Sequence, residues 1–220
     1  MKIIYEDDEL LVVDKPAGMD VIGLMEELIK ENPGLKRVGE EPRYGLVHRL
    51  DKETSGVILV AKSSEALIFF QKQFKNRVVE KKYIGLVNGI VKSDQGGIET
   101  LIGRGKSDKK KQRVYLPAEN IAGARVAITD YAVIKRFDDC TLLEIWPKTG
   151  RKHQIRVHLA HINHPIIADR VYGFRSQKKI EGLNRHFLHA ACLKVEMMNG
   201  ETKEFSSELP ANLKEAIDNL

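Results

Sequence analysis

Residues 45–61 read Gly45-Leu46-Val47-His48-Arg49-Leu50-Asp51-Lys52-Glu53-Thr54-Ser55-Gly56-Val57-Ile58-Leu59-Val60-Ala61. The aliphatic run that ends this stretch predicts a buried strand over residues 57–61. Asp51 then lies on a loop at the edge of that strand, where a rigid scaffold can hold a side chain over a cleft. The same residues also suit a simple turn, in which Asp51, Thr54 and Ser55 bond the backbone. The residues alone leave both interpretations open.

Outward from this stretch, strand patterns outnumber helix patterns. Strands are expected at 3–5, 10–13, 57–61, 83–87, 126–136, 141–146 and 187–197, and helices at 21–30, 64–76, from about 150 and after 210. In the last strand apolar residues alternate strictly, which predicts a half-buried strand. Because strands and helices do not alternate regularly, an α+β fold with a mixed, largely antiparallel sheet is favoured over a doubly wound one. No linker divides the chain, so one domain over residues 1–220 is predicted, with a basic loop or hairpin near 103–115.

The composition is that of a globular protein. The chain has 220 residues, of which 42% are hydrophobic and 30% charged, and this excludes disordered, collagen-like and coiled-coil classes. The longest aliphatic run falls far short of the roughly 18 residues that a membrane helix needs, and residues 1–14 contain no apolar signal core. A cytoplasmic protein without a membrane partner is therefore expected, with Cys140 and Cys192 reduced.

The net charge of +5 is unevenly distributed. One basic stretch contains Arg104, Lys106, Lys109, Lys110, Lys111 and Arg113 against a single acid, Asp108. A second contains Lys148, Arg151, Lys152 and Arg156 with no acid between them, whereas the first fourteen residues are acidic. This distribution fits a polyanionic partner such as nucleic acid, although a solvated basic loop fits it equally. The aromatic content of 6% argues against a base-stacking platform.

Four histidines, His153, His158, His161 and His164, raise the alternative of a metal-dependent hydrolase. Pro165 follows the last of them directly, and the two-histidine zinc motif with its adjacent glutamate is absent. No metal site is therefore predicted from these histidines.

Several motifs together resemble one family. The stretch His48-Arg49-Leu50-Asp51-Lys52-Glu53-Thr54-Ser55-Gly56 resembles the signature of the RluA-type RNA pseudouridine synthases. Further matching motifs occur in the family's order: residues 11–18 (Leu-Val-Val-Asp-Lys-Pro-Ala-Gly), 82–89 around Tyr83, 149–160 around Arg156, 164–173, and Leu188-His189-Ala190. The resemblance covers about residues 3 to 210. It favours a functional role for Asp51 over the interpretation as a turn residue.

The resemblance implies a pseudouridine synthase core with flanking helices and a central catalytic cleft. It implies an isomerase that detaches uracil from C1′ of a uridine, rotates it and rejoins it through C5, without a cofactor. Asp51 would be the nucleophile, and the Arg156 guanidinium would orient and keep charged its carboxylate. Tyr83 would pack against the uracil, and its hydroxyl is a candidate acceptor for the C5 proton. Attack of Asp51 at C1′, addition at C6 and formation of a glycal all use an ionised carboxylate, so the choice stays open.

The target uridine must leave its stack to reach Asp51. The resemblance suggests that Arg49 fills the space left by the base, and His48 either organises the loop or touches a phosphate. Attraction of the RNA backbone is assigned to Lys148, Arg151, Lys152, Arg104, Lys106, Lys109, Lys110, Lys111 and Arg113. The expected partner is a stem-loop of ribosomal or transfer RNA, and the protein is expected to be a monomer.

The chain departs from the family pattern at three points. Ala168 stands where the family usually has glycine, the His-Pro pair often seen after Gly18 is missing, and the motifs begin almost at Met1, which predicts no S4-type RNA-binding domain. RNA affinity then depends on the catalytic domain itself. The alternative is a non-catalytic RNA-binding or chaperone protein with the same fold, but such a protein need not keep Asp51, Tyr83 and Arg156 together.

Overall fold

The computed structural model describes residues 1–105, 111–116, 119, 121–176 and 179–220. The predicted phosphate contacts Lys106, Lys109 and Lys110 lie outside these residues. The described chain divides into two compact units, each built from two separate segments of the sequence. The first unit comprises Met1–Lys81 with His189–Leu209, and the second comprises Lys82–Leu188 with Pro210–Leu220.

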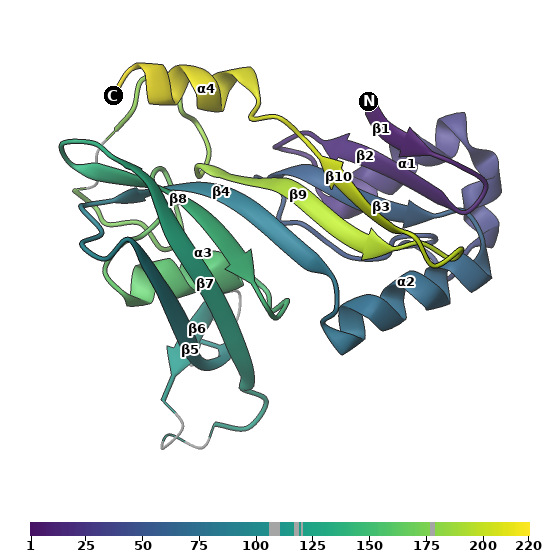
Figure 1. Ribbon diagram of the computed structural model, residues 1–220, viewed down its shortest axis with the longest axis horizontal. Coiled ribbons are helices and arrows are strands. Elements are labelled where there is room, and N and C mark those ends of the chain that lie inside the picture. The colour runs from purple at the N-terminus through teal and green to yellow at the C-terminus, as the bar shows by residue number, and fades with distance from the viewer. Residues whose placement is uncertain (106–110, 117–118, 120, 177–178) are drawn as a thin grey trace. The chain divides into compact units, whose positions relative to one another are not determined.

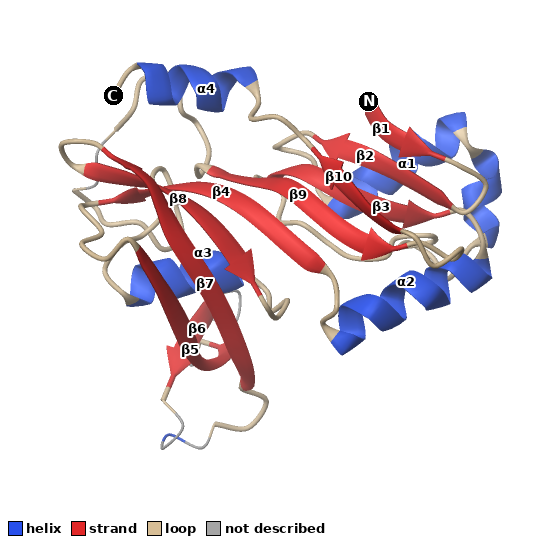
Figure 2. Ribbon diagram, in the orientation of Figure 1, coloured by secondary structure: helices blue, strands red, loops and turns tan. Residues whose placement is uncertain are grey.

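The first unit is a sheet with two helices beside it (Figures 1 and 2). Its elements are β1 (Lys2–Glu6), β2 (Leu10–Lys15), α1 (Val21–Glu31), the short 3-10 helix η1 (Pro33–Arg37), β3 (Ser55–Ala61), α2 (Ser64–Asn76), β9 (Leu188–Glu196) and β10 (Thr202–Ser206). The strands follow the order β1, β2, β3 and β9, and β10 pairs with β9. The β3–β9 pair is parallel, and the other pairs of this unit are antiparallel.

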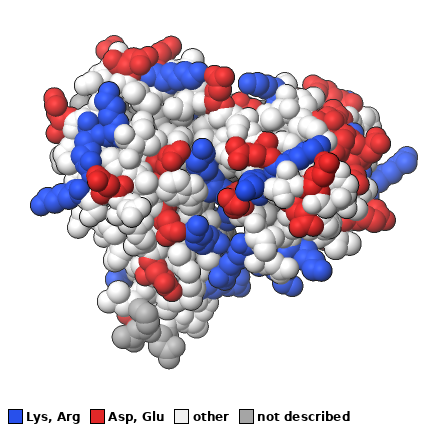
Figure 3. All heavy atoms as spheres, in the orientation of Figure 1, with Lys and Arg blue, Asp and Glu red and all other residues white. Residues whose placement is uncertain are grey.

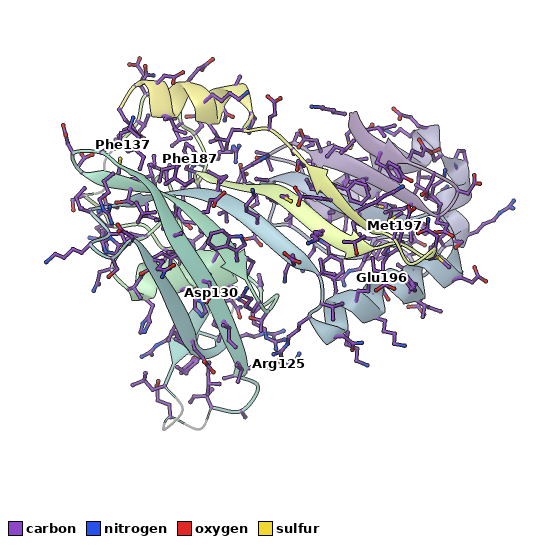
Figure 4. The ribbon with its side chains drawn as sticks, viewed as in Figure 1. Arg125, Asp130, Phe137, Phe187, Glu196 and Met197 are labelled. Carbon is purple, nitrogen blue, oxygen red and sulfur yellow. The ribbon has the colours of Figure 1, made fainter. Side chains whose placement is uncertain are left out.

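Apolar side chains on one face of β2 and β3 form part of the core of the first unit. Leu10, Val12 and Leu59 are fully buried and pack with Phe70 of α2 in one apolar cluster. Because side chains alternate between the faces of a strand, these residues fix which face of the sheet α2 covers. The Gln73 side chain then ties α2 to Glu196 at the end of β9, which Figure 4 labels. Its Nε2 donates to the Glu196 carbonyl (2.7 Å), and its Oε1 accepts from the Glu196 amide (3.1 Å).

Both helices of this unit begin at side-chain caps. Asp20 accepts hydrogen bonds from two amides of the first turn of α1, and Ser63 accepts from Ala66 in α2. Helix α1 stops at Asn32, immediately before Pro33, as the sequence predicts. Helix α2 ends at Arg77 in the left-handed backbone region, with φ of 62°.

The second unit is an antiparallel sheet that carries helix α3. Its elements are β4 (Glu80–Asn88), whose first two residues belong to the first unit, β5 (Gln95–Arg104), β6 (Gln112–Tyr115), β7 (Arg125–Arg136), β8 (Cys140–Pro147), α3 (Gln154–His161) and α4 (Ala211–Asp218). The strand order is β4, β8, β7, β5 and β6. The prediction of an α+β fold with a mixed, largely antiparallel sheet and flanking helices is confirmed.

Local expectations hold with a few corrections. In the basic stretch near 103–115, the described residues of β5 and β6 pair antiparallel, Leu101 to Arg104 with Tyr115 to Gln112. Helix α3 begins at Gln154 and not near 150, because His153 holds the left-handed conformation, with φ of 56°. Strand β10 and residues 95–102 of β5 are absent from the sequence-based expectations.

The prediction of a half-buried last strand is wrong for the first half of β9. Leu188, Ala190 and Cys192 are buried, and so are Phe187 and His189 on the other face, so both faces of this half are covered. Beyond Cys192 the same face carries Lys194 and Glu196, and only there does the predicted alternation hold. Polar residues in the second half of the strand therefore do not indicate that one face of the first half is exposed.

Candidate active site

Asp51 lies on a loop of the first unit that is closed by backbone hydrogen bonds. The Thr54 amide donates to the Asp51 carbonyl at 3.0 Å, and the Gly18 amide donates to the Lys52 carbonyl at 2.9 Å. The second bond joins the loop to the segment that follows β2. Asp51 is half-buried, as a carboxylate must be if it is both held in place and open to a substrate.

Lys15, at the end of β2, anchors the same loop from below. Its side chain is fully buried, and Nζ donates to the carbonyls of Pro16 (2.8 Å), Met19 (2.7 Å) and Lys52 (3.1 Å). A buried ammonium is costly unless hydrogen-bonded, so these carbonyls and the lysine stabilise one another. One side chain therefore fixes both the Lys15–Met19 turn and the residue next to Asp51.

His48 is held by contacts within the first unit. Its Nε2 accepts the Leu59 amide at 3.1 Å, and its ring stacks on Phe74 with a centroid separation of 4.6 Å. Desolvation, aided by the charge of Lys81, lowers the pKa of His48 to about 3. The neutral ring therefore joins the Asp51 loop to β3 and α2. These contacts support the loop-organising role, and an RNA contact by His48 stays a prediction.

The strand that follows Asp51 is pinned by a buried histidine. His189 Nε2 lies 3.0 Å from the Ser207 carbonyl and so carries the proton, which leaves Nδ1 to accept the Ser55 hydroxyl at 2.9 Å. Gly56 has φ of 118°, and a Cβ there would collide with the carbonyl of Ala190. Glycine is thus required where β3 meets β9, five residues after Asp51.

In the second unit, Arg156 is fixed by a buried carboxylate. Arg156 Nε donates to Asp169 Oδ2 at 2.7 Å, and Nη2 donates to Oδ1 at 2.9 Å. Burial alone would raise the pKa of Asp169, but the hydrogen bonds and charge of Arg156, with the amides of Val171 and Tyr172, outweigh burial and lower it. The guanidinium also lies over the Tyr172 ring, 5.2 Å from its centroid. Asp169 occupies one edge of the guanidinium, and guanidinium geometry allows a second carboxylate to bind the other edge.

A chain of buried polar groups holds α3 on the strands beneath it. His158 lies 2.9 Å from the hydroxyls of both Thr100 on β5 and Thr129 on β7, and Gln154 Nε2 donates to Thr129 Oγ1 at 2.9 Å. Desolvation, with a smaller contribution from His161, lowers the pKa of His158 to about 4. The predicted metal alternative assigned this histidine to a ligand cluster. The structure instead places it in a hydrogen-bond network that orients the helix bearing Arg156.

Tyr83 is half-buried on β4, opposite Ile145 of β8. Several of the cations predicted to contact the RNA backbone lie in the described residues. Those that are exposed are Arg104, Lys111, Arg113, Lys148 and Lys152. Lys148 lies 3.4 Å from Asp130 on β7 (Figure 4), and Arg151 Nε donates to the Val126 carbonyl at 3.1 Å. Arg49 is exposed on the Asp51 loop. The assignment of all these residues to RNA stays a prediction.

Within the described residues, neither a metal-ligand cluster nor a membrane-spanning helix is found. They contain no group of three His, Cys, Asp or Glu side chains arranged to hold a metal ion. None of their helices combines the length and the apolar composition that crossing a membrane requires.

Lys15, Asp169 and Tyr172 lie within the sequence motifs, but the motifs alone do not indicate which side chains or backbone groups these residues contact. Lys15 had a usable signal, because it is a charged residue within the strand β2, two residues after the apolar run Leu10–Val13. Asp169 comes 13 residues after its partner Arg156, beyond the end of α3, so helical spacing does not point to the pair.

The chain is similar to known proteins over most of its length. Residues 9–161 match the family described as RNA pseudouridylate synthase. The chain is 38% identical to an uncharacterized RNA pseudouridine synthase of Bacillus subtilis, with 100% of this chain and 73% of the relative covered. It is 37% identical to ribosomal large subunit pseudouridine synthase D of Borreliella burgdorferi, with 94% of this chain and 65% of the relative covered.

A solved structure shows the same fold. The structure of human RNA pseudouridylate synthase domain containing 1 superimposes with a TM-score of 0.82 at 26% identity, over 97% of this chain and 86% of that one. Both of the bacterial relatives named above are longer than the part that matches this chain.

Proposed function

Because the chain belongs to the RNA pseudouridylate synthase family, we propose that it isomerises specific uridines of ribosomal RNA, with Asp51 as the nucleophile. Residues 1–220 act as one catalytic domain in this proposal. The observation that carries it is the rigid support of Asp51 and of Arg156, each held by buried hydrogen-bonded groups in its own unit. Such support is what preorganised catalytic side chains need.

The reaction assigns one role to each of three side chains. The ionised Asp51 carboxylate attacks C1′, adds to C6 of the uracil, or removes the C2′ proton so that a glycal forms. In each route the bond between C1′ and N1 breaks, and its electron pair goes to the uracil. Arg156, fixed by Asp169, orients the carboxylate and keeps it ionised. Tyr83 packs against the uracil as it rotates. After C5 bonds to C1′, the C5 proton leaves, and the Tyr83 hydroxyl is the group proposed to relay it.

The substrate class follows from the relatives. Those from Borreliella burgdorferi and Yersinia pestis carry names that specify the ribosomal large subunit. Transfer RNA is the second candidate, since an RNA stem-loop of either kind presents an unpaired uridine to be flipped.

Release of tritium from uracil C5 tests the proposal. Large-subunit ribosomal RNA and transfer RNA, each transcribed with tritium at uracil C5, are incubated separately with the protein. Tritium appears in water only when C5 forms the new bond. We expect release from ribosomal RNA by the wild type, and a loss of at least about a thousandfold in Asp51→Asn, the scale on which removal of a catalytic nucleophile acts.

Glu53→Gln is the matched control, because it removes a carboxylate from the same loop. We expect it to retain most of the activity. Near-normal release by Asp51→Asn would overturn the nucleophile assignment. Release from transfer RNA alone would replace the substrate class. RNA binding without release from either pool would favour the non-catalytic alternative.

A further inference from the structure

The C-terminal part of α2 and the residue that follows it carry a cluster of cations, Lys72, Lys75 and Arg77, that belongs to none of the sequence motifs. Lys72, Lys75 and Arg77 are exposed, and none of them makes an ion pair with another described residue. Lys72 and Lys75 are three residues apart on a helix and so share one face. Figure 3 shows basic side chains along the lower edge of the region that α2 occupies in Figure 1, and acidic ones concentrated farther up and to the right.

This cluster adjoins the loop that carries Asp51. Phe74, between Lys72 and Lys75, stacks on His48 at 4.6 Å, and Asp51 follows His48 by three residues. Both sides of the stack belong to the first unit. The exposed Arg49 is next to His48, so the stack joins the cation-bearing end of α2 to a loop that itself carries an exposed cation.

The local fold does not account for Arg77. It ends α2 with φ of 62°, a conformation that glycine adopts with less strain than any residue with a Cβ. A cation in the last turn of a helix does interact favourably with the helix dipole, which could explain Lys75. It does not explain a long cationic side chain at the strained cap, where it pairs with no acid among the described residues.

We propose that Lys72, Lys75 and Arg77 bind phosphates of the RNA strand that flanks the target uridine. The occupant is an RNA backbone, because exposed cations in a row on one surface complement phosphates spaced along a strand. This inference rests on the proposed function for the identity of the ligand. It extends that function by giving the first unit a phosphate-binding surface separate from β5 and β6.

Equilibrium binding to the ribosomal RNA transcript at several salt concentrations tests the surface. The logarithm of the affinity falls linearly with the logarithm of the salt concentration, and each lost phosphate contact reduces the magnitude of this slope by about 0.7 to 0.9. In the triple variant Lys72→Gln, Lys75→Gln, Arg77→Gly we expect the slope to fall by about 2 and the affinity at low salt to fall at least about tenfold. The rate of tritium release at subsaturating RNA should fall by the same factor.

The matched control is Lys30→Gln, Lys36→Gln, Arg37→Gln, which removes the same charge from α1 and η1 of the same unit. An equal loss in both triple variants would show a net-charge effect and would overturn the proposal. An unchanged slope in the α2 variant would also overturn it.

The single variant Arg77→Gly separates binding from folding. Because glycine relieves the backbone strain, the thermal midpoint should stay the same or rise, while RNA affinity falls. A structural role alone would leave RNA affinity unchanged. If the wild type binds RNA with the expected slope but releases no tritium, the proposed function fails and the binding surface stands.

Discussion

Asp169 holds the guanidinium of Arg156 through two hydrogen bonds of 2.7 and 2.9 Å, with both side chains almost wholly buried. Asp169 Oδ1 also accepts hydrogen bonds from the amides of Val171 and Tyr172. The carboxylate therefore sets the position of Arg156 and the turn that follows residue 168. Arg156 is consequently a structural residue as well as a proposed catalytic one, and its replacement should affect both properties.

Removing one partner of this pair should destabilise the protein. Arg156→Met leaves an uncompensated buried carboxylate, and such a change typically costs about 3–5 kcal/mol. The double variant Arg156→Met, Asp169→Leu removes both charges and should regain much of that stability while remaining inactive. Chemical denaturation of the single and double variants measures the recovery. A double variant less stable than Arg156→Met would contradict the assignment of the pair as mutually compensating.

Replacing Ala168 with glycine should stabilise the protein. Ala168 has φ of 59°, and the Asp169 amide closes a turn onto the Ile166 carbonyl at 3.2 Å, which places Ala168 where a type II turn favours glycine. Glycine relieves the strain of the left-handed conformation in the folded protein, and its greater conformational entropy in the unfolded chain offsets part of that gain. The free energy of unfolding should therefore rise by about 0.5–1 kcal/mol. The denaturation midpoint should rise with activity retained. Ala168→Val is the opposing control, and a midpoint that rises with valine as well would show that backbone conformation is not the cause.

Lys15→Met should cost stability and loop order together. Methionine matches the length of the lysine stem but donates no hydrogen bond, so the carbonyls of Pro16, Met19 and Lys52 lose a common donor. Loss of a buried donor typically costs about 1–3 kcal/mol, and more when the donor is charged. Proteolysis in the 16–54 region should accelerate, and tritium release should fall. The exposed Lys36→Met serves as the control, and an equal effect there would refute the anchoring role of Lys15.

The stability of the protein should fall between pH 7 and pH 5. His158 is neutral in the folded protein, where desolvation lowers its pKa to about 4, whereas an unfolded histidine titrates near 6.5. As the pH falls through 6.5, the unfolded chain gains a proton that the folded chain does not, so stability is lost until the pH reaches about 4. This one group should contribute about 2 kcal/mol of loss at pH 5.

His158→Gln tests that contribution. Glutamine does not titrate and can still bond one of the two threonine hydroxyls, so the variant should be less stable at pH 7 but lose less stability on acidification. Urea denaturation at pH 7 and pH 5 gives the comparison. An unchanged loss between the two pH values would assign the pH dependence to other groups, of which His48 is the foremost.

The sequence by itself determined the local elements and the members of the site. Apolar residues three and four apart predicted α2 over residues 64–76, because a helix brings residues at that spacing onto one face. The order of motifs identified Asp51, Tyr83 and Arg156 as candidates and the family to which the chain belongs.

Only the tertiary structure decided what holds those residues. The Arg156–Asp169 pair, the Lys15 contacts and the His48–Phe74 stack each join residues that no helix or strand period relates. The burial of both faces of β9 likewise depends on which segments cover it. Contacts of this kind arise when distant segments pack together. Their geometry follows from the whole chain, and a local pattern of residues does not contain it.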